Sequence, residues 1–236
     1  MRATTNDLTV FVQARLGSSR FPRKILAQLA GRPVLEWVLR ALERTPAAVK
    51  LVLTDAETAP EIRLLAARAG FGVFVGSPDD VLSRFADAVR SFTPRPRWIV
   101  RACGDSPLIR ADLVPEVLEV TQDAGLDLAA PVDIPPGMGF EIIRTRSLLA
   151  AEKACHDPTS REHVTAGMWR GAWKTARVGL GLGGADLPSV SIETATDIPR
   201  VARLLREAKS SGRTPLEILQ AEAARDRDLV EMRMGE

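Results

Sequence analysis

Short apolar runs alternate with longer stretches of helical periodicity through the first half of the chain, and this alternation limits the folds available to it. The runs have the length of strands and lie at Leu8–Gln13, Val49–Leu53, Phe71–Val75 and Trp98–Cys103. Apolar residues recur at helical spacing in 33–44, 60–69, 81–89 and 111–124. This β-α-β-α-β-α-β order is typical of parallel strands covered on both faces. We therefore expect an α/β fold with a mostly parallel central sheet and helices on both faces.

The second half is less regular. Strands are expected at Asp127–Pro131, Phe140–Arg144, Trp173–Val178 and Val190–Glu193, and helices at 145–154, 161–169, 198–210 and 215–225. No linker separates independent units. We expect one domain with a small inserted subdomain, in three parts: approximately residues 8–125, 126–195 and 196–236.

Composition excludes several classes of protein. The 236 residues are 45% hydrophobic and 26% charged, with a formal net charge of +2, which excludes a disordered chain and does not predict a nucleic-acid binder. Two Cys and two His make a structural zinc site unexpected. No apolar run is long enough to span a bilayer, and the N-terminus is polar. We expect a cytoplasmic protein with reduced thiols and no membrane partner.

The first strand runs into a loop, residues 14–24, that is rich in small residues and cations. The loop supplies a glycine, two hydroxyls and four cations: Gly17, Ser18, Ser19, Arg15, Arg20, Arg23 and Lys24. Small residues let backbone N–H groups approach an anion, and cations balance phosphate charge. The loop is neither a Walker A sequence nor a dinucleotide-binding GxGxxG. Two interpretations stay open, a phosphate-binding loop and a solvated basic loop.

A carboxylate follows the fourth strand, in the sequence Gly104-Asp105-Ser106-Pro107. In an open parallel sheet, ligands collect at the carboxyl ends of the strands. Asp105 in that place suits a divalent metal that bridges phosphates, or else it caps the turn. Glu193 ends the last expected strand and supplies a second carboxylate if the two strand ends are neighbours.

Three further features have a functional and a structural interpretation. Arg101 lies in an otherwise apolar strand and needs an anion, which is either a protein carboxylate or a ligand phosphate. Ser77-Pro-Asp-Asp80 is typical of a helix start with Ser77 as the N-cap. His163 is either an acid, base or substrate contact, or an ordinary residue at a helix start. No nucleophile elbow is present, and neither Cys has an obvious base.

Five segments, in this order along the chain, match the motifs of one enzyme family. They read VQARLGSSRFPRKIL (12–26), GRPVLEW (31–37), GSPDDVLSRF (76–85), IVRACGDSPLI (99–109) and REHVT (161–165). The chain resembles cytidylyltransferases of the spore coat polysaccharide biosynthesis protein F type, which are relatives of CMP-KDO and CMP-N-acylneuraminate synthetases. The resemblance covers roughly residues 8–205. It implies a Rossmann-like, glycosyltransferase-A-like fold with a nucleotide-binding half, an acceptor-binding and dimerisation part, and C-terminal helices.

The resemblance also implies roles for individual residues. The catalytic residues would be Lys24, Arg15 and Asp105. The nucleotide would be bound by Gln13, Ala14, Arg15, Gly17, Ser18, Ser19, Arg20, Lys24, Asp80, Arg84, Arg101 and Gly104. The acceptor would be bound by Glu141, Arg161 and His163, and Mg²⁺ by Asp105 and Glu193. The chain has Glu193 and Gly139 where relatives typically have Asp.

The reaction implied by the resemblance is a Mg²⁺-dependent nucleotidyl transfer. CMP would pass from CTP to a nonulosonate-like or related sugar, with release of pyrophosphate, for surface polysaccharide or glycan biosynthesis. The partners would be CTP, a small sugar and a second copy of the chain in a homodimer. Two alternatives stay open: a transferase of the same fold with another nucleoside triphosphate or a phosphorylated acceptor, and a non-catalytic nucleotide-binding protein.

Overall fold

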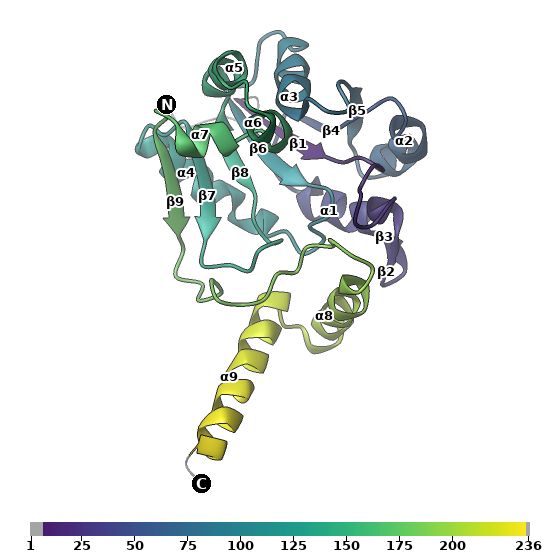
Figure 1. The fold of residues 1–236 in the computed structure, drawn as a ribbon, viewed down its shortest axis with the longest axis vertical. Coiled ribbons are helices and arrows are strands. Elements are labelled where there is room, and N and C mark those ends of the chain that lie inside the picture. The colour runs from purple at the N-terminus through teal and green to yellow at the C-terminus, as the bar shows by residue number, and fades with distance from the viewer. Residues whose placement is uncertain (1–6, 235–236) are drawn as a thin grey trace.

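A seven-stranded sheet lies at the centre of the molecule (Figure 1). The structure is a computed structural model that describes residues 7–234, with side chains for residues 7–225. The strands of this sheet are β1 (Leu8–Gln13), β4 (Val49–Thr54), β5 (Gly72–Val75), β6 (Trp98–Cys103), β7 (Leu128–Val132), β8 (Glu141–Arg144) and β9 (Thr175–Gly179). A two-stranded hairpin, β2 (Gln28–Leu29) with β3 (Arg32–Pro33), lies apart from it.

Helices follow most of the strands. They are α1 (Val34–Glu43), α2 (Ala59–Arg68), α3 (Val81–Arg90), α4 (Val114–Asp123), α5 (Thr145–Ala154), α6 (Pro158–His163), α7 (Ala166–Arg170), α8 (Asp197–Ser211) and α9 (Pro215–Met234). Short 3₁₀ helices occur at η2 (Lys24–Leu26) and η3 (Ala111–Leu113). Helix α9 extends away from the sheet (Figure 1).

The order of the strands is β5-β4-β1-β6-β8-β7-β9. Both neighbours of β8 are antiparallel to it, and the other neighbouring pairs are parallel. The mostly parallel α/β sheet expected from the sequence is therefore confirmed. The register pairs Gln13 with Cys103 and Arg101 with Glu141, which brings the polar ends of β1, β6 and β8 together.

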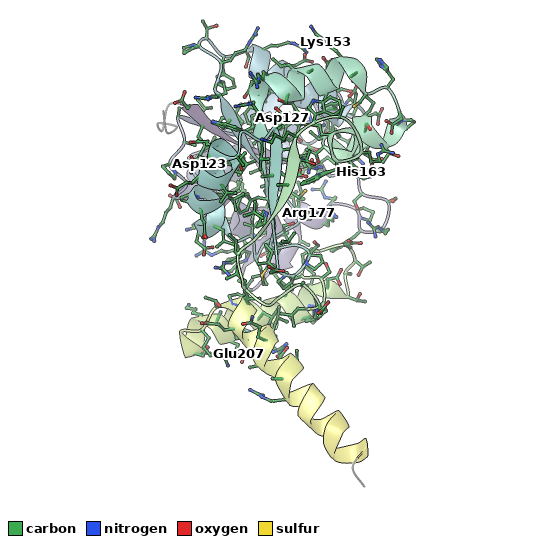
Figure 2. The ribbon with its side chains drawn as sticks, turned by 90° about the vertical axis from the view of Figure 1, so that its left-hand side faces the viewer. Asp123, Asp127, Lys153, His163, Arg177 and Glu207 are labelled. Atoms are coloured by element: carbon green, nitrogen blue, oxygen red, sulfur yellow. The ribbon has the colours of Figure 1, made fainter. Side chains whose placement is uncertain are left out.

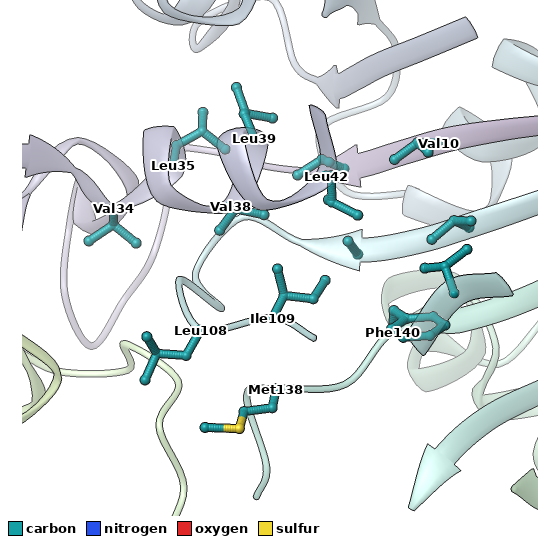
Figure 3. Packing of buried hydrophobic residues seen from close by; sticks show 14 of the residues in the cluster. Val10, Val34, Leu35, Val38, Leu39, Leu42, Leu108, Ile109, Met138 and Phe140 are labelled. Carbon is teal, nitrogen blue, oxygen red and sulfur yellow. The ribbon is translucent and has the colours of Figure 1, made fainter. Parts of the chain in front are cut away.

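Side chains of β1 alternate between two apolar clusters, as the period of a strand requires. Val10 and Val12 lie in the cluster that contains α1, whereas Phe11 lies in the cluster that contains α3 and α5. Figure 3 shows the α1 side of this packing, in which Leu35 and Leu39 belong to the same cluster as Val10. The sheet is thus buried on both faces.

The structure corrects three expectations about local structure. Residues 190–193 are not a strand, because their N–H groups bond to loops: Val190 N donates to the Pro136 carbonyl (2.8 Å) and Ile192 N to the Asp105 carbonyl (2.9 Å). The N-cap of α3 is Asp80 and not Ser77, since the Asp80 carboxylate accepts from Ser83 N (2.9 Å).

The expected helix over 161–169 is interrupted at Val164. This residue has φ 59° and ψ −61°, and Thr165 N donates to the His163 carbonyl at 2.6 Å. These values define a γ-turn with positive φ, a strained conformation for a β-branched residue. The turn separates α6 from α7.

Residues 126–195 add β7, β8 and β9 to the same sheet as the first half. The division into nucleotide-binding, acceptor-binding and C-terminal parts stays a prediction. None of the helices among the described residues combines the length and apolar character that crossing a membrane requires.

Candidate functional site

Two cavities adjoin at the carboxyl ends of β1 and β6. The smaller has a volume of about 330 Å³ and lies at the loop after β1, whereas the larger has about 610 Å³ and extends toward β7 and β9. Both are lined by the same five residues, Arg20, Lys24, Arg101, Cys103 and Asp105. A ligand in one cavity therefore meets a ligand in the other at these side chains.

The smaller cavity gathers most of the residues proposed for nucleotide binding. Eleven of those twelve line it: Gln13, Ala14, Arg15, Gly17, Ser18, Ser19, Arg20, Lys24, Arg84, Arg101 and Gly104. A glycine at position 104 permits the close approach of the ends of β1 and β6. A Cβ built there would lie 3.0 Å from the Ala14 Cβ and 3.1 Å from the Gln13 carbonyl oxygen. The ends of β1 and β6 thus approach closely, and Gly104 N donates to that Gln13 oxygen at 2.9 Å. Nucleotide binding by these residues stays a prediction.

The loop after β1 is held in place by contacts with α2 and with the residue that precedes this helix. Leu16 N donates to the hydroxyl of the buried Thr58 at 3.0 Å. Arg23 has φ 61° and forms an ion pair with Glu61, and its hydrogen bond keeps the pKa of that carboxyl below its ordinary value. Arg23 is therefore directed to α2, and the other three loop cations line the smaller cavity.

A lysine–carboxylate pair lies where the cavities meet. Lys24 Nζ is 2.5 Å from Asp105 Oδ2, and both side chains are largely buried. Beside it Arg20 forms an ion pair with Glu193. The hydrogen bond from Ile192 N to the Asp105 carbonyl places the Glu193 segment next to Asp105. The sequence leaves open whether these two carboxylates are neighbours, and the structure brings both to the larger cavity.

A polar network around Arg101 lies where the two cavities meet. Its guanidinium donates to Glu141 Oε2 (2.5 Å) and to Gln13 Oε1 (2.8 Å). Glu141 also accepts from Thr165 Oγ1 and from Trp169 Nε1, each at 2.8 Å. Arg101 therefore pairs with a protein carboxylate, one of the two alternatives that the sequence allows.

Burial and neighbouring charges shift the pKa values of Arg101 and Cys103 in this network. Burial by itself lowers the pKa of Arg101, but the Glu141 carboxylate together with Cys103 and Asp105 outweighs it, and the net shift is upward. Burial raises the pKa of the Cys103 thiol, which stays protonated at neutral pH. Arg101 is thus a permanent cation, and Cys103 is a poor nucleophile.

Arg84 is a buried cation, with 1% of its surface exposed. Its Nη1 donates to the Ser77 carbonyl at 2.7 Å, and its Nε has no hydrogen-bond partner in the described part of the chain. Burial lowers the pKa of Arg84, with partial compensation by the Asp55 carboxylate. A cation in this state at the wall of the smaller cavity favours the entry of an anion.

The three residues proposed for acceptor binding lie in three different places. Glu141 lines the larger cavity and His163 the smaller, while Arg161 is in neither lining. Arg161 pairs with Asp80 and donates to the Glu152 carbonyl at 2.7 Å, so it joins α6 to the start of α3 and the end of α5. This pairing also explains why Asp80 is the one proposed nucleotide ligand outside the smaller cavity. Acceptor binding by these residues stays a prediction.

Sequence reasoning missed two charged residues of the larger cavity, Asp133 and Arg177. Asp133 follows β7, and Arg177 lies within the edge strand β9. The available signals were weak: an acidic residue before the Pro-Pro-Gly turn, and a cation inside an expected strand.

The chain is similar to known cytidylyltransferases. The family model described as "Cytidylyltransferase" matches residues 9–162. Spore coat polysaccharide biosynthesis protein SpsF of Bacillus subtilis (strain 168) is 27% identical over 167 residues, which are 68% of this chain and 69% of that protein. A 3-deoxy-manno-octulosonate cytidylyltransferase of Anaeromyxobacter sp. (strain K) is 34% identical over 151 residues, which are 64% of this chain and 60% of that protein.

Solved structures show the same fold. A cytidylyltransferase from Leptospira borgpetersenii serovar Hardjo-bovis (strain JB197) gives a TM-score of 0.78 at 21% identity, covering 94% of this chain and 96% of that one. A CMP:2-keto-3-deoxy-manno-octonic acid synthetase complexed with CTP gives 0.65 at 18% identity, covering 86% and 99%. The family match spans well over half of the sequence and includes the loop after β1, the Asp105 turn and α3. The chain thus belongs to the cytidylyltransferase family and is a nucleotidyltransferase.

Proposed function

We propose that this chain transfers CMP from CTP to a sugar, nonulosonate-like or related, in a Mg²⁺-dependent reaction that releases pyrophosphate. The observation that carries the proposal is the junction of the two cavities at Lys24 and Asp105. The smaller cavity is assigned to the nucleotide, because the loop glycine, hydroxyls and cations line it. The larger is assigned to the acceptor, because it opens from the same junction and is lined by carboxylates and cations from six segments of the chain.

The chain's own residues act by position and charge. Backbone N–H groups near Gly17 and the cations Arg15 and Arg20 hold the triphosphate. The acceptor hydroxyl releases its proton to solvent water, its oxygen bonds to the α-phosphorus, and the bond from that phosphorus to the pyrophosphate oxygen breaks. Lys24 neutralises the charge that develops on the departing pyrophosphate. No covalent enzyme intermediate forms, which agrees with a protonated Cys103.

Asp105 and Glu193 are proposed to hold Mg²⁺. Two carboxylates suit this ion, which usually takes one or two protein ligands and leaves its other positions to phosphate oxygens and water. Among the described residues no cluster of three or more His, Cys, Asp or Glu offers a competing site. Both carboxylates pair with cations in the structure, so metal binding requires Lys24 and Arg20 to exchange partners. When bound, the metal would supply charge stabilisation to the transferring phosphate.

The biological setting follows the relatives' names. SpsF is named for spore coat polysaccharide biosynthesis, and the Anaeromyxobacter protein for transfer to 3-deoxy-manno-octulosonate. We infer a role in surface polysaccharide or glycan biosynthesis, in the cytoplasm, as a homodimer. Sedimentation velocity over a tenfold concentration range tests the dimer, and a single monomeric species would contradict it.

Thermal-shift binding of CTP, UTP, GTP and ATP, each with MgCl₂ or EDTA, tests the donor without knowledge of the acceptor. A ligand that binds only the folded state raises its stability by mass action. A Mg²⁺-dependent shift that is largest for CTP is expected, followed by pyrophosphate release in an acceptor screen. A larger thermal shift with another nucleotide would indicate that this nucleotide, and not CTP, is the donor. Shifts without pyrophosphate release from any sugar acceptor would contradict the proposed transfer of CMP to a sugar.

A further inference from the structure

The charges of the larger cavity are mostly cancelled within the protein. Eight charged side chains line it, and six form three ion pairs: Arg20–Glu193, Lys24–Asp105 and Arg101–Glu141. The two that remain, Asp133 and Arg177, have no ion pair with any side chain in the described part of the chain. The uncompensated charges of this cavity are therefore one anion and one cation.

Arg177 is presented to the cavity by a fixed aromatic ring. It lies on β9 (Figure 2), where its backbone is in register with Ala130 of β7. Its guanidinium carbon is 4.7 Å from the centre of the Trp169 ring. The ring is held in turn by the bond from Trp169 Nε1 to Glu141. A ring face orients a guanidinium without accepting its N–H groups in strong hydrogen bonds, so these donors stay available to a ligand.

Asp133 is presented by a backbone bend. It follows β7 with φ 62°, and its carbonyl accepts from Gly184 N at 2.8 Å. Its carboxylate lies beside β9, since a Cβ built at Gly179 would be 3.2 Å from Asp133 Oδ2. Asp tolerates the left-handed region better than most residues, so the bend needs no glycine. Among residues 7–225, whose side chains the structure describes, none donates a hydrogen bond to this carboxylate, so its oxygens can accept from a ligand.

These two residues lie across the cavity from the reaction centre. Strands β8 and β7 separate β9 from β6, so the backbones of β9 and β6 are three strand spacings apart, about 14 Å. Arg177 extends from β9, whereas Asp105 follows β6 and pairs with Lys24 of the loop after β1. The cavity, at about 610 Å³, extends from the junction to Asp133 and Arg177, so it offers both ends to a ligand of the size of a monosaccharide.

We propose that Arg177 and Asp133 determine which acceptor the cavity takes: Arg177 binds an anionic group, a carboxylate or a phosphate, and Asp133 accepts hydrogen bonds from sugar hydroxyls. This inference rests on the proposed function, because it assumes that the larger cavity holds the acceptor. Guanidinium binds planar carboxylate and phosphate oxygens through two N–H groups, and a carboxylate can accept from two hydroxyls. Neutral sugars lack the group that Arg177 binds.

The test compares charged and neutral sugars on the CTP-loaded protein. The probes are 3-deoxy-manno-octulosonate, glucuronate, glucose 1-phosphate, glucose 6-phosphate and glucose, measured by saturation-transfer NMR with CTP and Mg²⁺ present. We expect at least one anionic probe to bind about tenfold more tightly than glucose, and Arg177→Met to abolish that difference. The carboxylate and phosphate probes tell the two anion classes apart. Equal binding of all probes, or a preference that survives Arg177→Met, overturns the proposal.

Controls separate this inference from the proposed function. Arg68→Met changes an exposed arginine at the end of α2 and is expected to leave every affinity unchanged. Arg177→Met is expected to leave the thermal shift by CTP unchanged. If CTP gives no shift in the unmodified protein, the proposed function is contradicted. If CTP gives a normal shift but no anionic sugar is preferred, only the role of Arg177 is contradicted. Asn tolerates positive φ as Asp does, so Asp133→Asn is expected to keep the bend. This variant is expected to raise the KM for the acceptor several-fold without changing kcat. An unchanged KM overturns the role of Asp133.

Discussion

Lys24 Nζ lies 2.5 Å from Asp105 Oδ2 at the junction of the two cavities, and the Asp105 carbonyl accepts from Ile192 N of the segment that carries Glu193. One residue thus joins the loop after β1, the end of β6 and the second carboxylate. A change of charge at Asp105 acts on all three.

Asp105→Asn is expected to lower kcat by on the order of 10²-fold or more, the scale of losing one preorganised electrostatic group at a transition state. Asn keeps the size of the side chain, so the fold and the bond from Ile192 N to the backbone carbonyl are expected to persist. Steady-state pyrophosphate release measures the effect, and circular dichroism checks the fold. Asp112→Asn is the matched control, since it removes an exposed ion pair with Arg110. Turnover within twofold of the unmodified enzyme would disprove the role of Asp105.

Lys24→Ala is expected to weaken binding of the triphosphate by about tenfold and to lower kcat as well, because the same cation contacts ground-state and departing phosphates. Calorimetric titration with CTP measures the affinity. Lys50→Ala, which removes a surface lysine bonded to the Glu43 carbonyl, is the control. An unchanged CTP affinity together with an unchanged rate would exclude Lys24 from the nucleotide site.

Much of this site follows from strand order alone. Four expected strands placed Gln13 and Asp105 at strand ends, and parallel pairing of β1 with β6 brings such ends together. The partner of Arg101 does not follow in the same way, because β8 inserts between β6 and β7 although it comes later in the chain than both. An antiparallel insertion of this kind depends on tertiary packing, which no local pattern encodes. The same applies to Glu193, whose segment is fixed by bonds to loops rather than by strand periodicity.

The two arginines of the α3 region are expected to affect stability in opposite directions. Arg84→Met removes a buried cation that contacts no carboxylate of the described side chains, and is expected to raise the free energy of unfolding by about 1 kcal/mol. Arg161→Met breaks the ion pair with Asp80 and frees two carbonyls at the end of α5, at a cost of about 2 kcal/mol. Urea denaturation without nucleotide measures both.

Arg84→Met is also expected to reduce the thermal shift produced by CTP, since the wall of the smaller cavity then lacks its buried charge. A variant that is both less stable and normal in CTP binding would show that Arg84 serves the fold alone.

Glu141→Gln is expected to lower the free energy of unfolding by about 3 kcal/mol, because Arg101 keeps its buried charge while losing the carboxylate that balances it. Gln has nearly the same size as Glu, so loss of volume does not contribute. Its one oxygen still accepts a hydrogen bond from Thr165 or Trp169. Urea denaturation at pH 7 tests this, and the double variant Arg101→Met with Glu141→Gln is expected to recover part of the loss. A loss below 1 kcal/mol would mean that the network contributes little to stability.

Asp157→Asn is expected to remove a pH dependence at the start of α6. Hydrogen bonds from the Ser160 hydroxyl and backbone N–H, and the neighbouring Arg170, lower the pKa of Asp157 from 3.8 to about 2. The folded state therefore binds fewer protons than the unfolded state between these values, so the contribution of Asp157 is complete above about pH 4 and disappears as the pH falls toward 2. Chemical denaturation from pH 5 to pH 2.5 is expected to give a shallower loss of stability in Asp157→Asn than in the unmodified protein. Ser160→Ala should give part of the same change, and identical slopes in all three proteins would contradict the assignment.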